Sequence, residues 1–453
     1  MAVTYILLAI LLLHLVLFGK LIFKWNVFGV FFIATMLFSM VGIMAFPFFK
    51  PYFLEAFSSF KLNLITNVDI VKTQTVATVG ILSVLYAYVF TIALIYKRVK
   101  CINHFRIEGE IKDNLSRVNF YVLTLGVLMF IMVYLFLKRD VLLIGILQGL
   151  FGRQPDAILE SRRAITSNYL YTILIYNVLP FITIASFYIS LKRKKLLNKL
   201  LFLFLFAVSF FLILSLFQKR PLMIFMLSLF ITGFLFRQNL FPKKVKKVRS
   251  KKSKKRRYFI YLGLLFILLL VLYYSATTYK FENIFEAILK LSEIVLTRVF
   301  GRLSVPAFCY IHYFPAVEGY YGLTNIGVFS KIFGFPHFPD TQVLFSYFSA
   351  TKKEGSLAIN SVMDFYGAFG YVGVVFGNLF LGLFLAALDV FLDMLAKNSV
   401  NLVFIVFCFV FAYYLSQASL PRALLGYGFA FFVLTWLFLQ KGFKIRLRTH
   451  LKQ

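Results

Sequence analysis

The sequence has few acidic residues and almost no cysteine. It contains 17 Asp and Glu against 49 Lys and Arg, and its three cysteines, Cys101, Cys309 and Cys408, are scattered along the chain. Without paired spacing these cysteines provide neither a disulfide framework nor a zinc site. Charged residues make up only 15% of the chain, whereas hydrophobic residues make up 61%. This balance favours a membrane protein over a soluble one.

Several motifs of nucleotide and metal chemistry are also missing. The chain has no P-loop, no Gly-rich dinucleotide fingerprint and no His-Glu-x-x-His zinc helix. No Asp-x-Asp pair is present to hold a metal–nucleotide complex. A nucleotide sugar is therefore not the expected donor of a transfer reaction, and we predict no metal and no cofactor. The energy of such a reaction would have to come from an already activated lipid.

Hydrophobic runs of about 20 residues recur throughout, and this length crosses a hydrocarbon layer about 30 Å thick. We predict an all-α polytopic membrane protein with about eleven transmembrane helices. The spans are expected at roughly 3–23, 27–48, 74–96, 119–137, 168–190, 200–217, 221–236, 258–276, 367–392, 401–418 and 424–440. The first run, Val3 to Phe18, lacks a basic segment before it and a small-residue cleavage site. It is therefore expected to be a retained span and not a signal peptide.

The net charge of +32 would suggest a nucleic-acid partner for a soluble protein. Here membrane orientation explains the charge better, because basic residues collect in connections that stay cytoplasmic. They lie in residues 97–100, 192–195 and 243–257 and in the tail from Lys441. This pattern predicts a cytoplasmic C-terminus, an external N-terminus and no nucleic-acid partner. The run 243–257 could bind anionic lipid head groups or RNA, or serve only as a disordered topogenic loop.

The predicted spans divide the chain into three parts. Residues 1–276 form an N-terminal bundle of about eight spans with a basic loop at 237–257. Residues 277–366 form a large extracytoplasmic loop of short helices, and residues 367–453 form a C-terminal bundle of about three spans with a basic tail. The two halves show no repeat, and charges mostly lie at span ends, with His14 as the main exception. Both features argue against a transporter.

The large loop is predicted to open with an amphipathic helix. Polar side chains share one face, at steps of three or four: Glu282, Glu286, Lys290, Glu293 and Thr297. Arg298 and Arg302 follow one turn apart, so their guanidinium groups can converge on one anion. Two Arg forks suit a diphosphate, because each donates parallel hydrogen bonds to phosphate oxygens. Membrane-surface anchoring, or pairing with Glu293 and other acids, would explain the same pair.

The rest of this loop is rich in aromatic and turn residues, among them Tyr320, Tyr321 and Asn325. Tyrosine rings can stack on sugars while Asn binds hydroxyl groups, but tyrosine is also enriched at the membrane interface. His312 and His337 are the only histidines expected outside, and either is a candidate general base.

Three further external arginines are candidate anion ligands. Arg163 precedes a span, Arg220 lies in a very short turn, and Arg422 follows Pro421. Each could instead anchor a helix end by extending to the interface. External arginines run against the orientation bias, and we favour Arg163 and Arg220 over Arg422 as ligands.

The stretch from Asn360 to Gly382 combines one carboxylate with repeated glycines. Asp364 stands just before a hydrophobic helix that carries Gly367, Gly370, Gly373, Gly377 and Gly382. Membrane helices tolerate such glycines where another helix approaches their backbone closely. An acid at the mouth of this helix is a candidate base for an acceptor hydroxyl. Capping or polar packing at the span entrance is the alternative role.

This stretch and the large loop resemble the Wzy-type oligosaccharide repeat-unit polymerases, the O-antigen or polysaccharide polymerases. That family carries an acid-x-Tyr-x-x-Phe-Gly-x-x-Gly pattern at the entry to a late span. Here the pattern reads Asp364, Tyr366, Phe369, Gly370 and Gly373. The segments 300–304, 319–322 and 218–221 also resemble the family. The family's basic residue after an Ile-Pro pair is absent, and His337 or a lysine would take its place.

The resemblance implies a metal-independent glycosyltransferase with a GT-C-like fold, on the periplasmic face of the bacterial inner membrane. It would transfer a growing glycan from undecaprenyl diphosphate onto a new lipid-linked repeat unit. Its partners would be that lipid-linked oligosaccharide, membrane lipids and a chain-length regulator protein. The implied diphosphate ligands are Arg298, Arg302, Arg163 and Arg220. Asp364 would activate or orient the acceptor hydroxyl, and Tyr366 would join the glycan-binding tyrosines.

Two other functions remain open at the level of sequence. One is a ligase that moves the glycan to a different acceptor, or another lipid-diphosphate glycosyltransferase. The other is a transporter or flippase of the same lipid-linked sugar.

Overall fold

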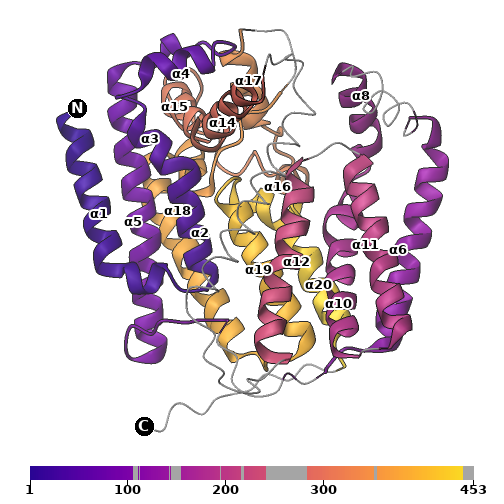
Figure 1. Ribbon diagram of the computed structural model, residues 1–453. Helices are drawn as coiled ribbons and strands as arrows, with labels where there is room; N and C mark the ends of the chain where they lie inside the picture. The colour runs from indigo at the N-terminus through magenta and orange to yellow at the C-terminus, as the bar shows by residue number, and fades with distance from the viewer. Residues whose placement is uncertain are drawn as a thin grey trace.

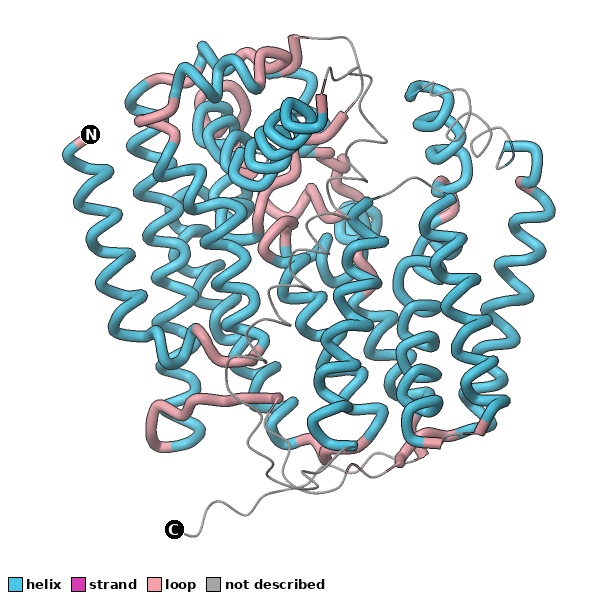
Figure 2. The backbone as a smooth tube through the Cα atoms, viewed as in Figure 1, coloured by secondary structure: helices cyan, strands magenta, loops and turns pink. Residues whose placement is uncertain are grey.

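The computed structural model describes residues 1–105, 111, 113–141, 143, 155–193, 195–215, 219–240, 283–301, 303–350 and 355–441. Every regular element in these ranges is a helix. Isolated β-bridges pair Phe60 with Ser349 and Leu115 with Gln440. Figure 2 shows helices along most of the chain, with irregular segments mainly at the ends of the bundle. The predicted all-α class is confirmed for this part of the chain.

Among the described residues, seven helical segments are long and apolar enough to cross a membrane. They are α1 (Ala2–Ile22), the run of α2 (Val27–Thr35), η1 (Met36–Met40) and α3 (Val41–Ala45), α5 (Asn67–Tyr96), α6 (Arg117–Leu137), the run of α9 (Tyr169–Ile173), η4 (Leu174–Val178) and α10 (Leu179–Lys192), α11 (Leu196–Ser215) and α18 (Ser361–Met394). Three further helices have shorter apolar stretches: α12 (Lys219–Leu240), α19 (Ser399–Leu415) and α20 (Phe429–Leu439). A multi-pass membrane protein is therefore confirmed. The predicted span at 258–276 lies outside the described residues, and the count of eleven stays a prediction.

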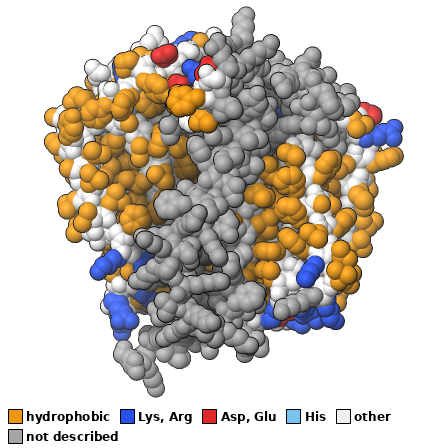
Figure 3. Space-filling model, in the orientation of Figure 1, with side chains coloured by type: hydrophobic (Ala, Val, Ile, Leu, Met, Phe, Trp, Pro, Cys, Tyr) orange, Lys and Arg blue, Asp and Glu red, His pale blue; other side chains and the backbone are white. Residues whose placement is uncertain are grey.

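The spans stand roughly parallel in Figure 1. Helices α1, α2, α5 and α18 lie on one side, α6, α10 and α11 on the other, and α12, α19 and α20 between them. The first residues of α1 and the last residues of α20 lie at opposite ends of the bundle. On the face shown in Figure 3, Lys and Arg gather mainly at the end where α20 finishes, which we call the basic end. Its assignment to the cytoplasm remains a prediction.

Short helices cover the opposite end, which we call the loop end. They are α4 (Lys50–Ala56), α8 (Pro155–Thr166), α14 (Ile284–Gly301), α15 (Ser304–Tyr313), α16 (Gly327–Phe333) and α17 (Asp340–Phe348). Helix α14 confirms the predicted helix at the start of the large loop. Helix α15 is buried along nearly its whole length and packs against α3, α5 and α18. The large loop is therefore built into the bundle and does not stand apart from it.

Helix α18 contains the predicted span at 367–392, and it is interrupted near its start. Gly370 has φ 65° and ψ −148°, values outside the helical region. The Asn378 side chain donates a hydrogen bond to the carbonyl of Val362 at 3.0 Å, sixteen positions earlier. Residues 361–369 therefore fold back against the helix that follows them. A glycine is needed at this break because only glycine adopts such angles without strain.

The glycines of α18 serve two different contacts. A Cβ atom on Gly382 would lie 2.4 Å from the carbonyl oxygen of Val84 on α5, so this glycine admits a neighbouring helix as predicted. A Cβ atom on Gly373 would lie 2.2 Å from the carbonyl oxygen of Phe365, within the folded-back segment. Gly373 therefore admits the chain's own preceding turns, and the sequence pattern does not separate these two cases.

A buried carboxylate ties the helices together at the basic end. The backbone N–H groups of Val27 and Phe28 donate to Asp389 at 2.8 and 3.1 Å, and the Tyr88 hydroxyl donates at 3.0 Å. The Nε2 atom of His104 lies 2.7 Å from the same carboxylate. The Asp389 carboxylate of α18 therefore holds three segments: the start of α2, helix α5 at Tyr88, and the segment after α5 that carries His104. The sequence analysis did not single it out.

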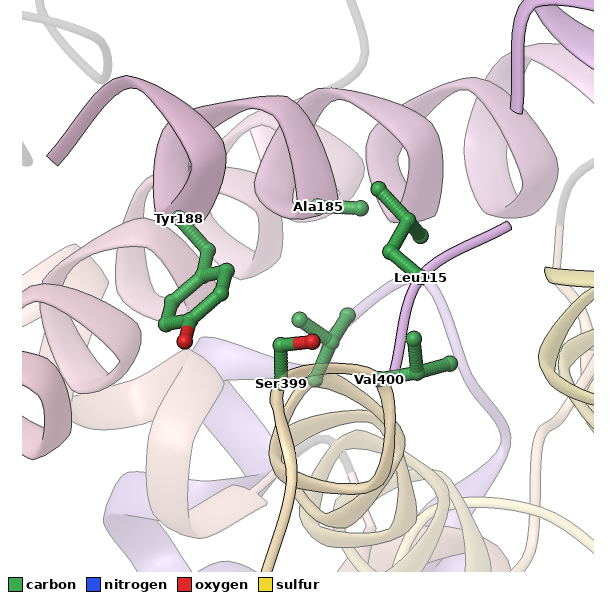
Figure 4. Close-up of a pocket in the computed structure, with 6 residues that line it drawn as sticks. Leu115, Ala185, Tyr188, Ser399 and Val400 are labelled. Carbon is green, nitrogen blue, oxygen red and sulfur yellow. The ribbon is translucent and has the colours of Figure 1, made fainter. Parts of the chain in front are cut away.

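A small apolar cavity lies near the same end (Figure 4). It is lined by Leu115, Ala185, Tyr188, Ser399, Val400 and Val403. Its volume of about 10 Å³ is the space of about one water molecule. It is too small to be a substrate site.

Candidate functional site

Asp364 is buried at the loop end, on the folded-back segment of α18. It is 5% exposed. The Tyr321 hydroxyl lies 2.9 Å from its Oδ1 atom, to which it can donate, and also 2.9 Å from its backbone carbonyl oxygen. The N-cap of α18 is Asn360, whose side chain accepts a hydrogen bond from Met363 at 2.9 Å. Helix capping is therefore not the role of Asp364.

Gly367 lets two tyrosine rings pack against the turn that carries Asp364. A Cβ atom on Gly367 would lie 2.7 Å from the Tyr321 ring and 2.8 Å from the Tyr310 ring. These distances are well below an ordinary van der Waals contact, so a larger residue would displace both rings.

A second buried carboxylate, Asp340, lies within electrostatic range of Asp364. Asp340 begins α17 and is 2% exposed. It accepts a hydrogen bond from the Tyr310 hydroxyl and one from Nη2 of Arg422, the latter at 3.5 Å. Burial raises the pKa of Asp340, and the charge of Arg422 and the Tyr310 hydrogen bond oppose that rise. We call Asp340 and Asp364 the acid pair.

Both tyrosines that contact the acid pair remain hydrogen-bond donors. Burial and the neighbouring carboxylates raise the pKa of Tyr310 and of Tyr321 well above the ordinary value. The two hydroxyl groups therefore stay protonated at neutral pH and hold the carboxylates in place.

Arg220, at the start of α12, lies among three tyrosine rings. Its guanidinium carbon is 4.8 Å from the ring centre of Tyr414, 4.9 Å from that of Tyr427 and 5.8 Å from that of Tyr413. Its Nη1 atom donates to the Tyr427 hydroxyl at 3.3 Å. The Nε and Nη2 atoms are buried and have no hydrogen-bond partner in the described part of the chain. A buried cation with unpaired N–H groups is costly, which makes this an attractive place for an anion.

Tyr427 connects this guanidinium to the acid pair. Arg422 begins the π-turn η5 (Arg422–Gly426), and the N–H group of Tyr427 donates to the Arg422 carbonyl at 2.9 Å. Arg220 and Arg422 both interact electrostatically with Tyr427. The unpaired cation and the two carboxylates therefore belong to one polar region at the loop end.

The predicted anion-binding arginines have different outcomes. Arg220 and Arg422 both reach the polar region, but Arg422 is paired with Asp340. Arg163, on α8, is exposed. The side chain of Arg298 and the whole of Arg302 lie outside the described residues, so their convergence on an anion stays a prediction.

The two candidate histidines contact different residues. The Nδ1 atom of His312 is 2.9 Å from a carboxylate oxygen of Asp69, which also forms the capping box of α5. His337 is exposed, and its Nδ1 atom is 3.0 Å from the carbonyl oxygen of Thr324. His337 interacts electrostatically with the acid pair through Asp340.

Two of the predicted glycan-binding tyrosines are corrected by the structure. Tyr321 and Tyr366 are 6% and 2% exposed, and their hydroxyls bond to Asp364 and to the Phe314 carbonyl. Their ring faces are packed against protein, so they build the site and do not offer a platform for sugars. Tyr320 is 41% exposed, and Asn325 is half-buried in the turn at 322–325. These two remain candidates for glycan contacts.

The sequence analysis missed Asp340, Tyr310, Tyr414 and Tyr427. Nothing in the sequence singled out Asp340, because most of the 17 acidic residues lie in the segments predicted to be outside. No signal existed for the tyrosines either, since 26 tyrosines are spread along the chain. Only the packing of α12 near α19 and η5 brings Tyr414 and Tyr427 to Arg220.

Metal chemistry finds no support at this site. Among the described residues, no group of three or more His, Cys, Asp or Glu side chains could hold a metal ion. The absence of a metal requirement stays a prediction. All three cysteines are free thiols. Comparisons with protein-family models, curated proteins and solved structures found no match.

Proposed function

We propose that this protein is a glycosyltransferase that polymerises oligosaccharide repeat units carried on undecaprenyl diphosphate. It would act at the loop end, on the extracytoplasmic face of the bacterial inner membrane, and build a surface polysaccharide. The choice of polymerisation over other lipid-diphosphate chemistry rests on the family pattern around Asp364.

One observation carries the chemical part of this proposal. A buried guanidinium without a carboxylate partner, Arg220, shares a polar region with two buried carboxylates. Charge this close to hydrocarbon is costly and is retained in membrane proteins chiefly for function. A cation that can take a diphosphate and an acid that can take a proton are the two groups that such a transfer needs.

The proposed chemistry assigns a role to each group. An acceptor hydroxyl forms a bond to the anomeric carbon of the donor glycan, and the bond from that carbon to the diphosphate oxygen breaks. The leaving diphosphate keeps the electron pair, and Arg220 stabilises the charge that develops on it. Asp364 orients the acceptor hydroxyl or accepts its proton, with Tyr321 holding the carboxylate.

Reconstitution tests this proposal. Purified protein is incubated with a defined undecaprenyl-diphosphate-linked repeat unit, and the products are separated by size. The wild type should give a ladder, and Asp364→Ala, Arg220→Gln and Arg302→Ala should abolish it while the protein stays folded and membrane-inserted. Arg139→Ala is the control, because this arginine is exposed and its contacts are with the exposed Asp140 and the neighbouring Phe136 ring.

The outcomes separate the candidate functions. Transfer of a single unit to another acceptor would favour a ligase, and movement of the lipid across vesicles without new glycosidic bonds would favour a transporter. A wild-type ladder from the Asp364 and Arg220 variants would refute the site.

A further inference from the structure

The anion site around Arg220 is built where two π-helical turns meet. Tyr176 and Asn177 lie on η4, and Tyr427 and Gly428 directly follow η5. A Cβ atom on Gly428 would lie 2.4 Å from the Asn177 side chain, so these two segments are in direct contact. The Tyr169 hydroxyl adds a bond from α9 to the carbonyl of Leu425 in η5, at 2.6 Å. Such π-turns occur often at functional sites.

Tyr176 adds a further unpartnered polar atom to this place. Its hydroxyl is buried and, in the described part of the chain, has no hydrogen-bond partner. It lies within electrostatic range of Tyr414, the ring that also packs against Arg220, and of Arg162 on α8. Within the described ranges, three buried polar atoms of this region therefore lack a hydrogen-bond partner: Nε and Nη2 of Arg220 and the hydroxyl of Tyr176.

An unpaired buried polar group costs free energy, so three of them in one region need an explanation. All three can donate hydrogen bonds, and the Arg groups can only donate. A ligand that satisfies them must offer several acceptor oxygens, and two guanidinium groups favour one with two negative charges. A diphosphate that joins a lipid to a sugar meets both conditions, because each of its phosphates carries one charge.

We propose that Arg220, Tyr176 and Arg162 together form a diphosphate-binding site, with Tyr176 as hydroxyl donor and Arg162 as second cation. The identity of the lipid rests on the proposed function, whereas binding of the diphosphate group does not. The three tyrosine rings that surround the guanidinium give it an apolar environment, which strengthens its bonds to phosphate oxygens.

This site changes the choice between two neighbouring arginines. The sequence analysis favoured Arg163, but Arg163 is exposed, whereas Arg162 is half-buried and within electrostatic range of Tyr176. Successive residues on a helix point about 100° apart, so the two side chains leave α8 in different directions. Arg163 is therefore a matched control for Arg162.

Ligand-dependent thermal stability tests the site without any assay of activity. Full-length protein in detergent is heated with inorganic pyrophosphate or farnesyl diphosphate, and with sulfate at equal ionic strength as the control anion. A ligand that binds only the folded protein raises the unfolding temperature by an amount that grows with the logarithm of its affinity. We expect protection by a diphosphate and none by sulfate.

The variants identify the residues responsible. Tyr176→Phe, Arg162→Gln and Arg220→Gln should each weaken diphosphate binding by about tenfold or more, the loss expected for one hydrogen bond to a charged group. Arg163→Gln and Tyr121→Phe, an exposed tyrosine on α6, should bind as the wild type does. Tyr176→Phe removes a single oxygen atom, so a fold defect does not obscure its result.

Each outcome decides the proposal. Protection by farnesyl diphosphate that is weaker in the three variants supports the site, with or without protection by pyrophosphate. Wild-type affinity in Tyr176→Phe and Arg162→Gln, or equal protection by sulfate, overturns it. If the protein binds the diphosphate but forms no glycan ladder, the polymerase proposal is refuted and the proposed diphosphate site is retained. If the wild type forms a glycan ladder but Tyr176→Phe and Arg162→Gln bind the diphosphate as tightly as the wild type, the polymerase proposal stands and this site is overturned.

Discussion

Replacing Gly373 by alanine tests the folded-back start of α18, on which the position of Asp364 depends. The added Cβ atom would lie 2.2 Å from the carbonyl oxygen of Phe365 and 2.8 Å from the Cβ atom of Phe369. The first contact is with backbone, which cannot rotate away as a side-chain tip can. The folded-back segment would have to move by roughly 1 Å to relieve an overpacked contact of this kind.

The expected change in unfolding free energy of Gly373→Ala is the sum of two opposing effects. Overpacking in a well-packed interior costs about 1–3 kcal/mol. Alanine gains up to about 1 kcal/mol over glycine in a helix. The net expectation is a loss of about 1–2 kcal/mol of unfolding free energy. A displacement of about 1 Å at a reacting group can also cost about 100-fold in rate, so the glycan ladder should nearly disappear.

Gly126→Ala is the matched control, because a Cβ atom on Gly126 in α6 would meet nothing within 4 Å. Unfolding is followed in detergent by the fraction of protein that remains monodisperse after heating, and activity by the ladder. The control should be as stable as the wild type or more so, and fully active. Equal stability and activity of the two alanine variants would show that residues 361–369 do not pack against Gly373.

Three further predictions follow from single contacts. Tyr321→Phe removes the hydroxyl that donates to Asp364. Ladder formation at equal amounts of folded protein should slow by about ten- to hundredfold, and an unchanged rate would show that this hydrogen bond does not contribute to the reaction. Asp389→Ala leaves its buried donors at the basic end unpaired. The unfolding free energy should fall by about 3–5 kcal/mol, and a wild-type unfolding midpoint would show that these hydrogen bonds do not stabilise the fold. Burial raises the pKa of Asp340 above 3.8, so the folded protein holds this proton more tightly than the unfolded chain, and stability should fall as pH rises from 3.8 through the folded value. Asp340→Asn should flatten that slope in unfolding midpoints measured across pH, and an equal slope in both proteins would refute the shift.

Strong periodic patterns gave the most dependable parts of the sequence analysis. The polar face from Glu282 to Thr297 predicted α14, because a 3.6-residue period leaves little freedom of interpretation. The glycine-rich stretch after Asp364 was harder, because the pattern of Gly373 and Gly382 fits any close neighbour. The structure shows a folded-back segment at one and helix α5 at the other.

The composition of the candidate site could be predicted only in part. Asp364 and Arg220 were found because each stands next to a hydrophobic run, where an isolated charge is conspicuous. Asp340 and Tyr176 were missed because nothing in their local sequence distinguishes them. A polar side chain becomes buried without a partner among the described residues, as Tyr176 is, or buried near another carboxylate, as Asp340 is, only when helices distant in sequence pack together.

The sequence by itself determined that this chain is a helical membrane protein with a large loop between its last groups of spans. Hydrophobic length and the position of charges act locally, so they can be recognised without knowing how the helices pack. Tertiary structure alone decided which acid faces which tyrosine and which of two adjacent arginines turns inward. Those choices depend on contacts among α12, α15, α18, α19 and the two π-turns, and contact between distant segments leaves no local pattern.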